Sequence, residues 1–326
     1  MIRTRFTELV GVEHPVMCGG MYIVGRAELA AAVSEAGGLG TITSKTQPTP
    51  EDLRREIRRV RELTRKPFAV NLNLFPSATP TPNEGYIAVL LEEGVRIVET
   101  SGRSPEPYMK VLKDNGVIVI HKVPGARYAV TAERLGVDAV SVVGNETGGH
   151  PGMTDVGGLV MIPRTVDSVR IPVLAGGGIA DGRGLAAALA LGAEGVVMGT
   201  RFMATRESMV HENVKQWMLR ASENDTVVIQ RSIGSPSRVA KNRISLEVLE
   251  REQAGATLEE LLPLISGARG RERVYEAGAT DEGVWSCGQS VGLIHDIPPV
   301  AEVMRRIMDE AEAVLRRLGR LADPEA

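Results

Sequence analysis

Short apolar runs alternate with longer amphipathic segments along the first two thirds of the chain. Continuous apolar runs of four or five residues are typical of strands buried on both faces, and apolar residues recurring every three or four positions are typical of helices. We expect strands at residues 15–18, 39–43, 68–72, 96–100, 117–121, 139–143, 172–175 and 195–198. Eight strands joined by helix-length crossovers predict an α/β fold, the (β/α)8 TIM barrel.

The segments between these strands have the period of helices, and most of them end on a glycine. Glycine adopts the left-handed conformation that closes a helix, as we expect at Gly94, Gly116, Gly136 and Gly192. The expected helices span residues 26–36, 50–63, 83–93, 105–115, 126–135, 158–169 and 181–191.

The pattern changes after residue 206, where the barrel domain (1–206) is expected to end. Residues 207–275 are charged and mostly of helical period, which predicts a smaller helical cap with no further strand. Residues 276–326 are expected to return to the barrel and to end in an amphipathic helix at 298–319.

Composition narrows the function classes. The 326 residues carry a net charge of −3 and only 3% aromatic side chains, which argues against nucleic-acid partners and anionic membrane surfaces. The two cysteines, Cys18 and Cys287, predict neither a disulfide framework nor a metal site, and Cys18 is expected to be a buried packing residue. The first residues lack an apolar signal core and no apolar run is long enough to cross a membrane, so we expect a cytoplasmic protein.

Glycines follow the seventh and eighth expected strands, at Gly176–Gly178 and at Gly199–Thr200. Backbone N–H groups there can approach a phosphate, and the helix that starts near Asp181 would favour the anion through its dipole. The alternative is a pair of tight turns without a ligand. A G-x-G-x-x-A pattern at 182–187 resembles a dinucleotide fingerprint, but it lies inside the expected helix start and lacks the acidic partner.

One titratable side chain, His150, lies in the Gly-rich loop after the sixth strand. A histidine at this edge of a barrel can take or give a proton near neutral pH. The alternative is a structural histidine that caps a turn. Lys122, at the end of the fifth strand, can direct its charge at a flavin edge or a phosphate, or else form an ordinary ion pair.

Several motifs together resemble one known family. They are HPVMCGGM, AGGLGTI, PFAVNLNL, VIVIHKV, GGHPG, LAGGGIADGRG, VVMGTRF and GVWSCGQSVGLI, spread over residues 4–293. The chain is similar to the 2-nitropropane dioxygenase family, which contains nitronate monooxygenases and closely related FMN-dependent NADH:quinone reductases.

The resemblance implies a TIM barrel that binds FMN under a helical cap. His150 stands where the family carries its proton acceptor. The implied contacts of the cofactor are Gly20, Met21, Asn73, Lys122 and Gly149 for the ring and Gly176, Gly177, Gly178, Gly199 and Thr200 for the phosphate. Asn73 stands where relatives often show Thr or another small polar residue. Pro76 fits the reductase branch, and Ala78 stands where that branch can carry a polar gating residue.

The implied reaction is the oxidation of alkyl nitronates or nitroalkanes by O2 to a carbonyl compound and nitrite. The alternatives are an NAD(P)H:quinone reductase with NADH or NADPH as co-substrate, a flavin-dependent enoyl-thioester reductase, and a flavin-binding protein without turnover. The expected partner is a small-molecule substrate, and a homodimer is the expected assembly if the chain associates.

Overall fold

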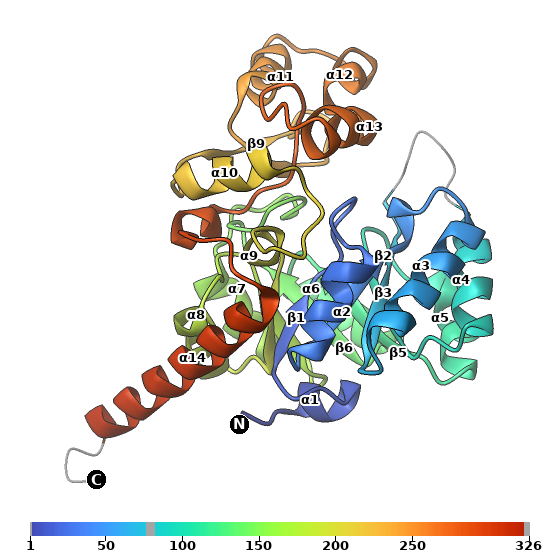
Figure 1. The fold of residues 1–326 in the computed structure, drawn as a ribbon, viewed down its shortest axis with the longest axis vertical. Helices are drawn as coiled ribbons and strands as arrows, with labels where there is room; N and C mark the ends of the chain where they lie inside the picture. The colour runs from blue at the N-terminus through green and yellow to red at the C-terminus, as the bar shows by residue number, and fades with distance from the viewer. Residues whose placement is uncertain (1, 76–81, 323–326) are drawn as a thin grey trace.

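The computed structural model describes residues 2–75 and 82–322. Its main sheet has eight parallel strands in the order β1-β8-β7-β6-β5-β4-β3-β2. The strands are β1 Val16–Cys18, β2 Gly40–Thr43, β3 Phe68–Asn73, β4 Ile97–Ser101, β5 Ile118–Val123, β6 Ala139–Val143, β7 Val173–Gly176 and β8 Gly195–Met198. A parallel bridge between Met17 and Leu39 joins β1 to β2 and closes the sheet. The TIM barrel predicted from the sequence is therefore confirmed (Figure 1).

Helices cover the outside of this barrel. Those that follow the strands are α2 Ala27–Glu35, η1 Ser44–Thr46 with α3 Pro50–Leu63, α4 Asn83–Glu92, α5 Glu106–Asp114, α6 Ala126–Arg134, α7 Gly158–Val166, α8 Gly182–Ala190 and α9 Thr200–Met203. The last helix, α14 Val300–Ala322, packs between α8 and α2 and takes the outer position that the short α9 leaves open. Gly182 permits the contact, because a Cβ there would lie 2.3 Å from the carbonyl oxygen of Ile307.

The cap lies between α9 and α14, over the carboxyl ends of the barrel strands. It contains α10 Glu212–Arg220, β9 Thr226–Ile229, β10 Ser237–Ala240, α11 Arg243–Gln253, α12 Leu258–Ile265, α13 Gly267–Arg269, η2 Gly270–Glu276 and η3 Gln289–Leu293. The expectation of no further strand is wrong, since β9 and β10 form an antiparallel hairpin. The β-branched run Thr226–Ile229 explains the strand, and the hairpin packs on α11 and α12 through Ile229, Val239 and Val248.

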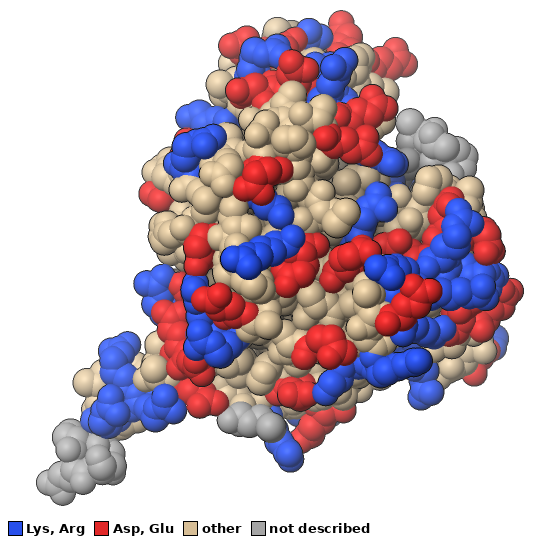
Figure 2. Space-filling model, viewed as in Figure 1, with Lys and Arg blue, Asp and Glu red and all other residues tan. Residues whose placement is uncertain are grey.

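No described helix is long and apolar enough to cross a membrane. On the face drawn in Figure 2, acidic and basic side chains are interspersed over the barrel and the cap. A mixed surface of this kind agrees with the small net charge of −3.

The amino end of the barrel is filled by apolar side chains. Alternate strand residues point inward, and at this level they form one buried cluster. Its barrel members are Met17, Leu39, Ala69, Ile97, Ile120, Ala139, Leu174 and Val197. Helix α1 (Arg5–Val10) closes the opening below them with Phe6, which is fully buried, and with Val10.

The inward positions two residues further along the strands differ on the two sides of the barrel. Strands β2 to β6 place polar side chains there, namely Thr41, Asn71, Glu99, Lys122 and Ser141. Strands β7, β8 and β1 are neighbours in the sheet and carry glycine at the same level. Gly176 is the last residue of β7, and Gly199 and Gly19 directly follow β8 and β1. One side of the barrel mouth thus lacks side chains, which leaves space for a flat ligand against the backbone.

Candidate active site

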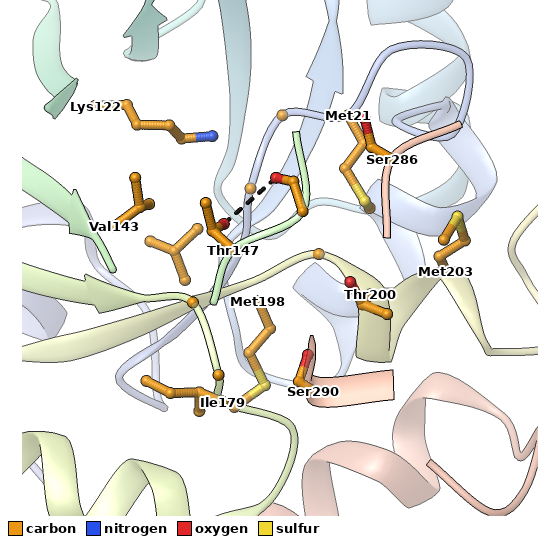
Figure 3. A pocket seen from close by; sticks show the side chains of 17 residues that line it. Met21, Lys122, Val143, Thr147, Ile179, Met198, Thr200, Met203, Ser286 and Ser290 are labelled. Carbon is orange, nitrogen blue, oxygen red and sulfur yellow. Dashed lines mark hydrogen bonds between the residues drawn. The ribbon is translucent and has the colours of Figure 1, made fainter. Parts of the chain in front are cut away.

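A cleft opens at the carboxyl ends of the strands, between the barrel and the segment that returns from the cap (Figure 3). It encloses about 620 Å³ of empty space, counted to the solvent at its mouth. Its lining includes seven of the residues predicted from the sequence, namely Gly20, Met21, Lys122, Gly177, Gly178, Gly199 and Thr200.

The turn after β7 presents free backbone donors to this cleft. Gly177 and Gly178 have φ of +88° and +74°, a conformation that favours glycine. Their N–H groups donate to no other residue of the described ranges. Adjacent N–H groups in such a turn form a concave site for an anion. The cradle is tight, because a Cβ on Gly177 would lie 3.1 Å from the carbonyl oxygen of Gly144.

The start of α8 does not contribute to the cradle as expected. Its first N–H groups already have partners: the Asp181 carboxylate accepts from Arg183 and Gly184, and Glu310 accepts from Gly182. The free N–H groups at this edge of the cleft therefore belong to the turn itself rather than to the start of α8. The same hydrogen bonds remove the G-x-G-x-x-A segment from consideration as a phosphate loop.

The floor of the cleft is the backbone after β1. A Cβ on Gly20 would lie 2.4 Å from Cγ of Asn71, and a Cβ on Gly19 would lie 2.7 Å from Cγ1 of Val197. Glycine is required at both positions, because a side chain would displace the strand ends that shape the cleft. Opposite this floor, the Thr200 hydroxyl accepts a hydrogen bond from Gly288 N and so attaches the returning segment to the barrel.

Sequence reasoning missed a buried carboxylate beside this floor. Glu99 on β4 is fully buried, and its Oε2 accepts hydrogen bonds from Gly20 N at 2.8 Å and from Asn71 Nδ2 at 2.7 Å. Its Oε1 lies 3.4 Å from Nζ of Lys122. The available signal was an acidic residue inside a predicted barrel strand, where side chains are expected to be buried. Lys122 therefore both lines the cleft and forms an ion pair.

The loop that carries His150 is held by the cap. Gly149 and Arg238 of β10 exchange backbone hydrogen bonds of 2.9 and 2.7 Å. The Arg238 side chain is buried and donates from Nε to the carbonyl oxygen of Asn145, at the start of the same loop. The hairpin that the sequence reading missed is thus the element that positions the histidine.

The ring of His150 packs against an aromatic side chain and does not cap its turn through a hydrogen bond within the described ranges. Its ring packs against Phe75 with centroids 4.4 Å apart, and its side chain makes no hydrogen bond within the described ranges. Desolvation by the surrounding protein, followed by the charges of Lys45 and Lys122, lowers the pKa of His150. The side chain is nevertheless exposed to solvent, which weakens this shift. At neutral pH the imidazole is uncharged and faces two cations.

The remaining predicted residues lie outside the cleft lining. The side chain of Asn73 accepts from Phe75 N, the carbonyl of Gly176 accepts from Gly144 N, and Gly149 is paired with the cap as described. Pro76 and Ala78 lie outside the described residues. Cys18 is buried and free as expected, and burial raises the pKa of its thiol. Lining residues that the sequence analysis did not name are Thr147, Gly148, Met203, Ser286 and Ser290.

A closed (β/α)8 barrel with a cleft at the carboxyl ends of its strands has the architecture of TIM-barrel enzymes, whose chemistry lies at that end. The chain belongs to the nitronate monooxygenase family, whose sequence profile matches residues 3–310. Proteins of this family are oxidoreductases and are in general flavin-dependent.

Individual relatives cover nearly the whole chain. A (3aS,4S,5R,7aS)-5-hydroxy-7a-methyl-1-oxo-octahydro-1H-indene-4-carboxyl-CoA dehydrogenase of Rhodococcus jostii is 35% identical over 98% of this chain and 99% of its own. The structure of FabK from Thermotoga maritima has a TM-score of 0.90 and 42% identity over 98% and 99% of the two chains. Nitroalkane oxidase from Streptomyces ansochromogenes has a TM-score of 0.83 and 25% identity over 96% and 99%.

Proposed function

We propose that this chain is an FMN-dependent oxidoreductase in which His150 removes a proton from the carbon next to an electron-withdrawing group. The observation that carries the proposal is the uncharged His150 beside Lys45 and Lys122 at the mouth of a cleft with a free anion cradle.

The donor set fits a flavin mononucleotide. The free N–H groups of Gly177 and Gly178 suit a terminal phosphate, with Gly199 and Thr200 on the neighbouring strand end. The backbone of Gly19 and Gly20 leaves room for the flat ring, and Lys122 supplies a cation at its edge. When bound, the flavin would accept the electrons or hydride that leave the substrate.

The neutral state of His150 at pH 7 suits a reaction in which the substrate loses a proton. A neutral imidazole can accept a proton, whereas a general acid would have to be protonated, which a lowered pKa disfavours at pH 7. Lys45 and Lys122 would stabilise the negative charge that develops on a carbonyl or nitro oxygen as the proton leaves. The site thus suits a substrate whose α-proton is acidified by such a group.

Two substrate classes meet this requirement. The first candidate is an acyl-CoA thioester, because the Rhodococcus relative is named a carboxyl-CoA dehydrogenase and is similar over nearly its whole length. The second is a nitroalkane or its nitronate, supported by the family and by the nitroalkane oxidase structure. With a thioester, His150 would take the α-proton and the hydride on the β-carbon would leave toward the flavin, which would give the enoyl thioester. With a nitroalkane, His150 would take the α-proton to give the nitronate, whose oxidation to a carbonyl compound and nitrite would use the flavin and O2.

The test uses the purified protein with FMN, mixed without oxygen. Butyryl-CoA should bleach the flavin absorbance, and His150→Asn should abolish this while keeping the yellow colour. Neutral nitroethane should likewise depend on His150, whereas ethyl nitronate, which has already lost its proton, should not. NADH followed by a quinone tests the reductase alternative. A protein that stays colourless after incubation with FMN would refute the proposal, as would a His150→Asn variant as active as the wild type on both neutral substrates.

A further inference from the structure

Among the described residues, the carboxylate of Glu99 is the only group that forms an ion pair with Lys122. Glu99 has no exposed surface, while the Lys122 side chain is 25% exposed and ends in the cleft. Figure 3 shows the ammonium group of Lys122 directed toward the backbone after β1. A buried carboxylate is costly unless it has a partner of opposite charge and further hydrogen bonds.

The two oxygens of the Glu99 carboxylate have different contacts. Oε2 is satisfied by Gly20 N and by Asn71 Nδ2, which fixes the side chain against the floor of the cleft. Oε1 accepts no hydrogen bond within the described residues and faces Nζ of Lys122 at 3.4 Å. The carboxylate is therefore held by neutral donors on one side and is left to balance the lysine on the other.

We propose that Glu99 is the counter-ion of Lys122 and that this charge-balanced pair keeps the reduction potential of the bound flavin low. The inference rests on the proposed function, because it assigns Lys122 to the edge of the flavin. Glu99 does not line the cleft, so it is a positioning and charge-balancing residue rather than a catalytic one. A cation near the ring favours the electron-rich reduced flavin, and a neighbouring carboxylate offsets that effect.

The sign of each substitution follows from the charge that it leaves behind. Glu99→Gln keeps the shape and removes the negative charge, so the flavin should become easier to reduce and its midpoint potential should rise. Lys122→Met leaves the carboxylate alone and should lower the potential. The double variant restores the net charge of the wild type, and its potential should return toward the wild-type value.

The experiment measures the midpoint potential of the protein-bound flavin against a reference dye during anaerobic reduction. For Glu99→Gln we expect at least about a tenfold change in the ratio of oxidised to reduced flavin, about 30 mV for two electrons. The matched control is Ser101→Ala, which removes a neutral acceptor 3.3 Å from Asn71 Nδ2 in the same cluster and should leave the potential unchanged.

Two outcomes would overturn the inference: a Glu99→Gln potential equal to that of the wild type, or a double variant displaced further than either single variant. If Glu99→Gln does not fold, the midpoint potentials of Lys122→Met and the double variant test the inference. Thermal unfolding without flavin gives an independent readout, since Lys122→Met leaves the fully buried Glu99 carboxylate without its cation and the double variant does not. The double variant should therefore melt above Lys122→Met. Absence of bound flavin in the wild type would refute the proposed function, and this melting order would still test the pair.

Discussion

The two levels of the barrel interior differ in what their side chains do. At the amino end, inward residues from all eight strands and from α1 form one apolar cluster. Two residues further along the same strands, the inward positions are polar side chains on β2–β6 and glycines at β7, β8 and β1. Because the alternation of strand residues fixes both levels together, a single register places the stabilising layer below the reactive one.

The residues expected to stabilise the barrel and those expected to serve its chemistry therefore lie two positions apart on each strand, at different heights along the barrel axis. Substitutions below should change the free energy of unfolding with little effect on cofactor binding, and substitutions above should do the reverse. The predictions below test this separation.

The largest effect is expected on turnover, from a substitution of His150 above the polar layer. His150→Asn should reduce turnover of a neutral substrate by about 10²–10⁴-fold, because a positioned base contributes a factor of this size. The affinity for FMN should stay within about twofold, since His150 does not line the cleft surface at the cradle. Steady-state kinetics and fluorescence titration of FMN measure the two quantities. A parallel loss of flavin binding would assign His150 to the cofactor instead.

A substitution in the apolar layer should lower stability and leave FMN affinity unchanged. Phe6→Ala removes a fully buried ring beneath the barrel and should lower the free energy of unfolding by about 3–5 kcal/mol. Urea denaturation measures the loss, and FMN titration of the folded variant should match the wild type. The exposed Leu321→Ala, at the end of α14, serves as the surface control and should change stability little.

Most of the barrel could be predicted from the sequence because its signals are local. The strands at 139–143 and 195–198 were predicted with their observed bounds, since a parallel strand buried on both faces is a continuous apolar run. The cap hairpin was missed because three of the four residues of β9 are only partly buried, so its pattern is weaker.

The candidate site divides in the same way. The glycine turn after β7 was predicted, and Gly177 and Gly178 there adopt a positive φ that favours glycine. Gly199 after β8 was predicted too, although its φ of −116° does not require glycine. Glu99 was not, because its role depends on Gly20, 79 positions away, and on Lys122. The support of the His150 loop by Arg238 likewise joins residues from different domains of the expected organisation. Contacts between residues far apart in the chain leave no local sequence pattern from which they could be predicted.

A smaller effect, on the pH dependence of the free energy of unfolding, is expected from His121 on the outward face of β5. Burial lowers the pKa of His121 on β5 to about 4, against 6.5 for the unfolded chain. Between these values the unfolded chain binds a proton that the folded chain does not, so stability should rise with pH and be lost as pH falls from 6.5 to 4. The contribution is about 3 kcal/mol. Urea unfolding at several pH values should show a flatter profile for His121→Gln. An unchanged profile would contradict the assignment.

The smallest effect tests whether the β7 turn binds the cofactor or only turns the chain. Gly177→Ala should weaken FMN binding about tenfold, because a Cβ at a positive φ is strained and this one would press on the carbonyl of Gly144 within the cradle. Gly136→Ala is the matched control: it has a similar φ, +85°, but a Cβ there meets nothing within 4 Å, and it lies just after α6, away from the cleft lining. Both variants carry comparable backbone strain, so both should lose some stability. Only Gly177→Ala should lose affinity for FMN in a fluorescence titration. Equal affinities for the two variants would mean that the turn after β7 shapes the chain without binding the phosphate.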